Sequence, residues 1–150
     1  MEAKKFKVII VEDVKLELKG TEEIFRHEIP EAEIIGTAMT EQEFWSLMEA
    51  GVPDLVLLDL GLGGSTTIGV DICRNIFKRY PGVYVLIFTG EILNEKLWVD
   101  VLDAGADGII LENRRVAEQK RMYKPLWMGR SLSLIIPYWK KLWSVLRLLS

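Results

Sequence analysis

Acidic residues stand directly after short apolar runs at three places in this chain of 150 residues. They are the pair Glu12 and Asp13, then Asp59, and finally Glu112. If the apolar runs are parallel strands of one sheet, their carboxyl ends lie along one edge, so these acids would converge although they are far apart in sequence. Converging carboxylates repel one another and require a cation. A site made only of oxygen ligands suits Mg²⁺, which keeps several waters and takes one or two carboxylates directly.

The elements that would position these acids alternate between strand and helix. Apolar runs predict strands at residues 6–11, 33–37, 55–58, 83–88 and 108–111. Amphipathic stretches predict helices at residues 15–28, 41–50, 68–79, 94–104 and 114–124. Right-handed crossovers between successive strands then produce a parallel sheet with helices on both faces. We therefore expect an α/β fold with a doubly wound, five-stranded parallel sheet.

Residues typical of helix ends support these boundaries. Thr40 and Glu43 have the spacing of a capping box before the second helix. Pro81 with Gly82 should end the third helix, and Gly105 should end the fourth.

Composition indicates one soluble domain. The chain is 49% apolar and 27% charged, which is ordinary for a globular protein. Cys73 is the only cysteine, so an internal disulfide is excluded. No basic and apolar leader begins the chain, and it has no run of 18 apolar residues, so we expect a cytoplasmic protein without a membrane span.

Charge divides the chain into an acidic body and a basic end. Residues 1–112 carry 10 Lys/Arg and 21 Asp/Glu, a net charge of −11, whereas residues 113–150 carry 9 Lys/Arg and one Glu, a net charge of +8. A basic end can bind nucleic acid, an anionic membrane surface or an acidic partner, or fold back on the acidic body. The expected division is a domain at residues 1–127 and a basic, Trp-rich helical tail at residues 128–150.

The tail is apolar around most of its predicted helix, which begins at Pro137. Such a helix must bury two sides, against its own domain or against a second chain. We expect the tail to be a docking or dimerisation element, with a homodimer through the tail or the fifth helix as one outcome. Residues 145–150 faintly resemble the start of a helix-turn-helix output domain, but no recognition helix follows, so direct DNA binding by this chain is not expected.

Four segments resemble the signature blocks of response regulator receiver domains, in order and at fitting separations. They are residues 8–13 (VIIVED), 53–60 (PDLVLLDL), 86–90 (LIFTG) and 104–111 (AGADGIIL). The resemblance covers about residues 6–124. It implies a flavodoxin-like fold and a phosphoacceptor in a two-component or phosphorelay pathway.

The resemblance also implies roles for individual residues. Asp59 would be the phosphoacceptor, and Glu12, Asp13 and Asp59 would hold Mg²⁺ together with the backbone carbonyl of Gly61. Thr89 would be the switch hydroxyl that contacts the phosphoryl group. Physical chemistry agrees, because a carboxylate attacking phosphorus forms an acyl phosphate, and a cation neutralises the charge on the transferring oxygens. A phosphoryl group offers strong acceptors that would draw a nearby hydroxyl inward.

Three departures from the family pattern bear on function. Glu112 stands where receivers carry a lysine that pairs with the phosphoryl group, and only Arg114 or Arg115 could replace that lysine. Two like charges near 4 Å at an effective dielectric of 20 cost about 4 kcal/mol, which would oppose a stable phosphoaspartate. Gly63 replaces a proline in a loop about two residues longer than usual, so a more mobile wall of the site is expected. Ile109 replaces the aromatic switch residue.

Two other residues are interpreted as structural. His27 is the only histidine in the chain, so it cannot belong to a histidine metal cluster. Cys73 shares a predicted buried helix face with Ile72, Ile76 and Phe77, which favours a core residue over a nucleophile.

The sequence thus predicts a receiver that takes a phosphoryl group on Asp59 with Mg²⁺, from a histidine kinase or a phosphotransfer protein, and switches a partner-binding surface. Its catalysis would be limited to gaining and losing its own phosphoryl group, so it is not expected to be an enzyme otherwise. The first alternative is a pseudo-receiver, in which Glu112 prevents phosphorylation and the fold is a protein-interaction module. The second alternative, a hydrolase of the haloacid dehalogenase class, requires an acid where Gly61 stands.

Overall fold

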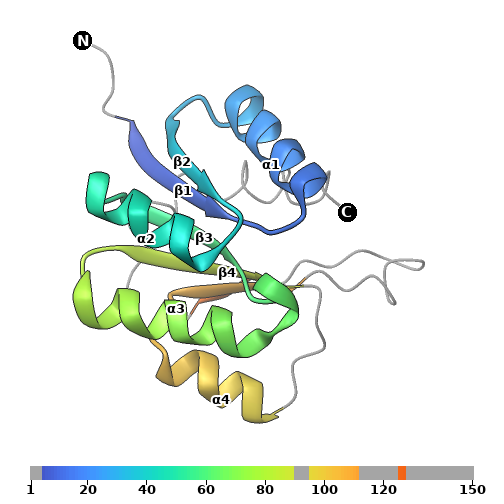
Figure 1. Ribbon diagram of the computed structural model, residues 1–150, viewed down its shortest axis with the longest axis vertical. Coiled ribbons are helices and arrows are strands. Elements are labelled where there is room, and N and C mark those ends of the chain that lie inside the picture. Colours follow the sequence, from blue (N-terminus) through green and yellow to red (C-terminus); the bar gives the residue numbers. More distant parts are fainter. Residues whose placement is uncertain (1–4, 90–94, 112–124, 128–150) are drawn as a thin grey trace.

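A computed structural model describes residues 5–89, 95–111 and 125–127. Strands and helices alternate along the chain (Figure 1). The elements are β1 (Phe6–Val11), α1 (Lys15–Glu28), β2 (Ala32–Ala38), α2 (Glu41–Ala50), β3 (Leu55–Asp59), a 3₁₀ turn η1 (Leu62–Gly64), α3 (Thr66–Arg79), β4 (Tyr84–Thr89), α4 (Glu95–Asp103), β5 (Gly108–Leu111) and β6 (Pro125–Trp127).

The strands form one sheet in the order β2-β1-β3-β4-β5-β6. The first five strands are parallel, and β6 pairs with β5 in the antiparallel direction. The predicted sheet of five parallel strands is confirmed, whereas the short sixth strand was not predicted. Residues 114–124, where the fifth helix is predicted, and the tail at 128–150 lie outside the described residues.

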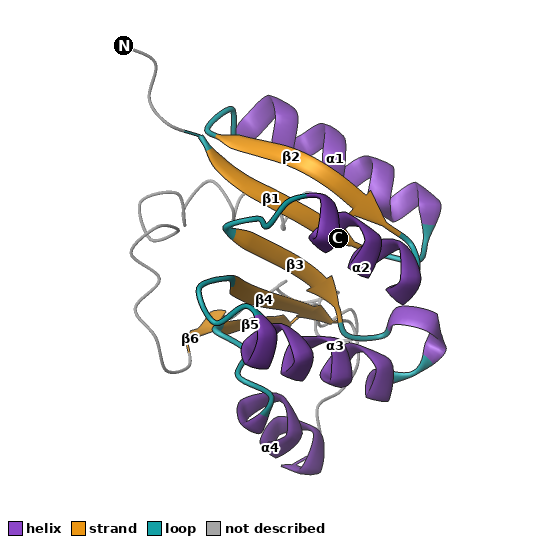
Figure 2. Ribbon diagram, turned by 60° about the vertical axis from the view of Figure 1, so that its left-hand side comes forward, coloured by secondary structure: helices purple, strands orange, loops and turns teal. Residues whose placement is uncertain are grey.

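Both faces of the central strands are buried, which explains why these strands read as continuous apolar runs. In β1, Ile9 and Val11 point to one face, Val8 and Ile10 point to the other, and all four side chains are at most 2% exposed. Helices α2, α3 and α4 cover the face of Ile9 and Val11, and α1 lies on the opposite face (Figure 2). Among the described residues of α1, Phe25 is fully buried.

Two aspartates tie the amino-terminal ends of neighbouring strands together. The Asp54 carboxylate accepts a hydrogen bond from the Lys7 amide at 2.7 Å, which joins the start of β3 to β1. The Asp107 carboxylate, 1% exposed, accepts from the Val85 amide at 2.9 Å, which joins the start of β5 to β4. These bonds help to set the register between neighbouring strands. That register in turn determines which residues lie side by side at the carboxyl ends of the strands.

Predicted helix ends agree with the observed caps. The Thr40 hydroxyl accepts a hydrogen bond from the Glu43 amide at 3.1 Å, and the Glu43 carboxylate accepts from the Met39 amide at 2.8 Å. Gly105 follows α4 with a φ of +87°, a left-handed conformation that favours glycine. The capping interaction at Thr40 and the helix stop at Gly105 are therefore confirmed.

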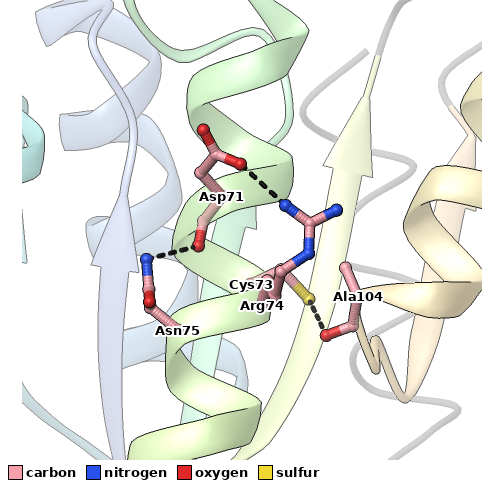
Figure 3. Close-up of polar contacts among 5 residues, drawn as sticks. All are labelled: Asp71, Cys73, Arg74, Asn75 and Ala104. Carbon is pink, nitrogen blue, oxygen red and sulfur yellow. Dashed lines mark hydrogen bonds and ion pairs between the residues drawn. The ribbon is translucent and has the colours of Figure 1, made fainter.

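Helix α3 makes polar contacts within the helix and with Ala104, which follows α4 (Figure 3). Arg74 pairs with the Asp71 carboxylate at 2.8 Å on the exposed side, while the Cys73 thiol points inward toward the Ala104 carbonyl, 3.6 Å away. Burial raises the pKa of the Cys73 thiol to about 12, so the expectation of an unreactive core cysteine is supported. The expectation for Phe77 is wrong, because its side chain is 49% exposed where it packs over Gly105.

Among the described residues, no helix has the length and apolar character that crossing a membrane requires.

The first prediction concerns Gly69, which lets α3 approach the turn after β3. An ideal Cβ at residue 69 would lie 2.6 Å from the Leu60 carbonyl oxygen and 3.0 Å from the Leu60 Cα. Alanine is favoured over glycine within a helix by about 1 kcal/mol, but a contact with backbone atoms cannot be relieved by a side-chain rotation. We expect Gly69→Ala to lower the free energy of unfolding by at least about 1 kcal/mol, measured by urea denaturation.

Gly51→Ala is the matched control for this prediction. Gly51 has an extended φ of −177°, and an added Cβ there would meet no atom within 4 Å. Its stability should be unchanged or slightly increased. A Gly69→Ala protein as stable as the Gly51→Ala protein would show that α3 is not held close to Leu60.

Candidate functional site

Three acidic residues meet at the carboxyl edge of the sheet because β1 and β3 are adjacent, parallel and in register. Val11, the last residue of β1, pairs with Leu58, the last residue but one of β3. Glu12 and Asp13 therefore follow β1 directly beside Asp59, which ends β3. The backbone pairing of β1 and β3 therefore suffices to bring the three residues to the same edge of the sheet.

The side chains of Glu12, Asp13 and Asp59 converge. Each offers a carboxylate oxygen, and these oxygens all lie within 4.8 Å of one another. Glu12 is 6% exposed, whereas Asp13 and Asp59 are half-buried. The predicted convergence of these three residues is what the structure shows.

Backbone amides hold each of the three carboxylates. The Glu12 carboxylate accepts from the Val14 amide at 3.2 Å, and the Asp59 carboxylate accepts from the Gly61 amide at 3.0 Å. The Asp13 carboxylate accepts from the Gly63 amide at 3.0 Å, across 50 residues of sequence. These donors are neutral dipoles, so they orient the acids without cancelling their charge.

The electrostatics of the cluster are those of crowded acids. Burial, followed by the nearby charge of Asp59, raises the pKa of Glu12 to about 9. Burial also raises the pKa of Asp59, and this rise is opposed by the hydrogen bonds that Asp59 accepts from the Gly61 amide and from Glu12. Burial and neighbouring carboxylates therefore disfavour ionisation of both Glu12 and Asp59.

Glu17 is a further acid that the sequence reasoning missed. It lies in the first turn of α1, and its charge contributes to raising the pKa of both Glu12 and Asp59. The sequence could have indicated this role, because Glu17 stands in the first turn of the helix that follows Glu12 and Asp13, and such a turn lies close to the end of the preceding strand.

A divalent cation fits this donor set. Three carboxylates provide hard oxygen ligands, and none of the ion pairs found among the described residues neutralises them. The buried position of Glu12 makes its charge costly unless a cation is present. The Gly61 carbonyl, also expected as a ligand, accepts a hydrogen bond from the Gly64 amide at 3.0 Å and keeps a second lone pair.

The sequence also predicted Thr89 and Glu112 as site residues. Thr89 ends β4, where it pairs with Leu111 at the end of β5, so its backbone lies on the same edge of the sheet. The orientation of its side chain is not described. Glu112 follows Leu111 directly but lies outside the described residues.

The loop after β3 is anchored at several points. Leu62 is 2% exposed and packs into the core, the Gly64 amide closes a turn on the Gly61 carbonyl, and the Gly63 amide reaches Asp13. Whether this loop is more mobile than usual stays untested. In this conformation, Leu62, Gly63 and Gly64 each hold it to another part of the structure or close its turn.

The comparisons with known proteins agree with this geometry. The family model of the response regulator receiver domain matches residues 8–119. The DNA-binding transcriptional activator DevR/DosR of Mycobacterium tuberculosis is 29% identical over 126 residues, which are 84% of this chain and 56% of that protein. The transcriptional regulatory protein DegU of Brevibacillus brevis is 30% identical over 109 residues, 72% of this chain and 44% of that protein. The chain thus spans about half the length of these relatives.

Solved structures share the fold. The signal receiver domain of a DNA-binding response regulator from Colwellia psychrerythraea has a TM-score of 0.64 and 21% identity, covering 93% of this chain and 99% of that one. A LuxR-family two-component response regulator from Aurantimonas has a TM-score of 0.64 and 24% identity, covering 76% of this chain and 79% of that one. Since the family model covers most of the chain, this chain belongs to the response regulator receiver domains of two-component signalling.

Proposed function

We propose that this receiver domain accepts a phosphoryl group on Asp59 with Mg²⁺ as cofactor and thereby changes a surface that binds a partner. The observation that carries the proposal is the convergence of Glu12, Asp13 and Asp59, with their oxygens within 4.8 Å of one another and Glu12 buried. Glu12, Asp13, Asp59 and the Gly61 carbonyl would hold the ion. When bound, Mg²⁺ supplies the positive charge that offsets both the three acids and the transferring oxygens.

The phosphodonor is proposed to be a phosphohistidine of a histidine kinase or a phosphotransfer protein. An oxygen of Asp59 attacks phosphorus, the P–N bond breaks, and its electron pair stays on the imidazole nitrogen. The imidazole leaves as a neutral ring because its other nitrogen has taken a proton. Asp59 is suited to this step because the Gly61 amide orients its carboxylate at the strand end.

Readout is proposed to pass from Thr89 to the segment that follows β4. Thr89 ends the strand adjacent to β3, and Asp59 pairs with Phe88 in the sheet, one residue before it. A phosphoryl group on Asp59 adds close to two negative charges and strong acceptors beside that strand end. The Thr89 hydroxyl would be drawn toward it and would carry the start of α4 with it. The expected cytoplasmic location of this exchange stays a prediction.

One observation favours a second function, a pseudo-receiver that binds its partner without phosphorylation. Glu112 puts a negative charge directly after β5, at the position where the family pattern has a lysine. A fourth acid at this edge of the sheet would repel a phosphoryl group and add to the charge that Glu12, Asp13 and Asp59 already concentrate there. Both functions use the same fold. One measurement distinguishes them: a phosphoacceptor is modified on Asp59 by a small phosphodonor such as acetyl phosphate in the presence of Mg²⁺, and a pseudo-receiver is not.

The second prediction concerns the metal. Mg²⁺ should bind to the cluster and shift the amide resonances of Gly61 and Gly63 in an NMR titration. Asp13→Asn removes one ligand charge and should strongly weaken this binding, because the two remaining carboxylates attract the ion less. Asp71→Asn, which removes an exposed acid from α3, is the control and should bind Mg²⁺ as the unchanged protein does. Equal titrations of the Asp13→Asn and unchanged proteins would exclude this assignment.

The third prediction concerns pH and Glu12 in the metal-free protein. Its pKa of about 9 in the folded state lies above the ordinary value of 4.5, so the folded state binds more protons than the unfolded state between these pH values. The free energy of unfolding should therefore fall as pH rises through this window. Glu12→Gln removes the titration and should stabilise the metal-free protein at pH 8 by about 1–3 kcal/mol, with little effect at pH 4.

The control for this prediction is Glu33→Gln, the same substitution at an exposed position of β2. It should leave the pH dependence unchanged. Thermal unfolding at pH 4 and pH 8 measures both variants, and added Mg²⁺ should stabilise the unchanged protein more than Glu12→Gln. A pH profile that Glu12→Gln leaves unaltered would contradict the burial argument.

The fourth prediction separates the two proposed functions. Glu112→Lys adds a donor for the phosphoryl oxygens and removes a like charge, so it should increase the yield or the lifetime of phospho-Asp59. Glu118→Lys makes the same charge change six residues further along and should have a smaller effect. Mass spectrometry after treatment with acetyl phosphate measures both. Equal lifetimes in the Glu112→Lys and unchanged proteins would remove the main support for the pseudo-receiver.

A further inference from the structure

The glycine-containing turn after β3 contacts the acidic cluster through its backbone. The Gly61 amide donates to Asp59, and the Gly63 amide donates to the Oδ2 atom of Asp13, both at 3.0 Å. The first bond is local, because it spans two residues. The second joins the β3–α3 turn to the end of β1 and spans 50 residues, so it exists only in the folded protein.

The conformation of the turn makes this second bond possible. Gly63 has a φ of +68° and Gly64 a φ of +75°, both in the left-handed region that side chains disfavour. An ideal Cβ at residue 63 would lie 3.1 Å from the Cδ1 atom of Ile68. The Gly64 amide closes the turn on the Gly61 carbonyl at 3.0 Å, and buried Leu62 anchors it to the core. The hydrogen bond within the turn and the buried Leu62 therefore hold the Gly63 amide toward Asp13.

A hydrogen bond from an amide has a specific effect on a metal-binding carboxylate. It restricts the rotation of the carboxylate and stabilises the charged form, but it adds no net charge that would repel a cation. Groups that orient metal ligands in this way support metal affinity although they do not touch the metal. The family pattern has proline at the position of Gly63, and proline carries no N–H, so this support depends on the glycine of this chain.

We infer that the backbone N–H of Gly63 is a positioning group for Asp13, which sets the Asp13 carboxylate for Mg²⁺ before the ion binds. This inference rests on the proposed function, since it concerns the same metal site. It makes the β3–α3 turn part of the cation site through an amide that does not contact the cation. The two neighbouring glycines contribute in different ways, because the Gly64 amide closes the turn on Gly61 and the Gly63 amide donates to Asp13.

The direct test replaces the amide of Gly63 with an ester by protein semisynthesis, which removes the N–H and keeps the chain length and the absence of a side chain. The control is the same ester at Gly82, an exposed glycine that precedes β4 at the opposite edge of the sheet. Mg²⁺ affinity is measured by titration calorimetry. The ester at residue 63 should weaken Mg²⁺ binding by about threefold to tenfold, at or below the lower end of the range for lost outer-shell partners because Gly63 is exposed to water. The ester at residue 82 should leave affinity close to that of the unchanged protein.

A second measurement uses the ordinary chain and does not depend on ester synthesis. The NMR resonance of the Gly63 amide should move upfield in Asp13→Asn, which has a neutral acceptor, while the resonance of the Gly64 amide stays in place.

The outcomes distinguish this inference from the proposed function. Absence of Mg²⁺ binding by the unchanged protein would overturn both. Normal binding by the unchanged protein, with equal affinity in the Gly63 ester, would overturn only the positioning role of the amide. Tighter binding in the Gly63 ester would also overturn it, because the amide would then compete with the metal for Asp13.

Discussion

Glu12 is a carboxylic acid held at 6% exposure at the end of a strand that is otherwise apolar, within a few ångströms of the oxygens of Asp13 and Asp59. Such crowding is unfavourable without a cation, because burial and like charge both act against ionisation. The fold nevertheless holds the acids together, since parallel pairing of β1 and β3 determines where each strand ends. The stability of the buried sheet thus sustains a site that is electrostatically strained.

The supports of this site are mainly backbone groups. Amides of residues 14, 61 and 63 donate to the three carboxylates, and the described ion pairs lie elsewhere, on the helices. Asp54 and Asp107 act at the opposite ends of the strands, where each accepts from the amide of a neighbouring strand. Acid side chains therefore serve two purposes in one sheet. At the amino edge they complete the hydrogen bonding of the strands, and at the carboxyl edge they leave negative charge available to a cation.

A site balanced in this way is responsive to changes of charge. A divalent cation would offset the repulsion among the acids, and a phosphoryl group on Asp59 would add negative charge and new acceptors beside β4. Thr89 ends that strand, and α4 begins six residues later. The anchored turn around Gly63 restrains the opposite side of the site. A response to phosphorylation is therefore proposed to appear on the β4–α4 side, because β4 is paired with β3, which carries Asp59.

The amino-acid sequence by itself determined the alternation of strands and helices, because both faces of the sheet are buried and each central strand reads as a continuous apolar run. It also determined the convergence of Glu12, Asp13 and Asp59, since parallel strands end at one edge. Local signals sufficed for the cap at Thr40. The sixth strand was not predictable, because three residues at 125–127 carry no periodicity and acquire a partner only through β5.

Other features of the site depend on contacts between segments far apart in the chain, which no local pattern records. The bond from Gly63 to Asp13 requires a left-handed turn placed against the end of β1. The contribution of Glu17 depends on how α1 leaves the strand end, and the exposure of Phe77 depends on the position of Gly105. Sequence determined which chemical groups are present and at which strand ends they stand. Only the tertiary structure decided which of them touch, because distances between segments are set by packing of the whole sheet and its helices.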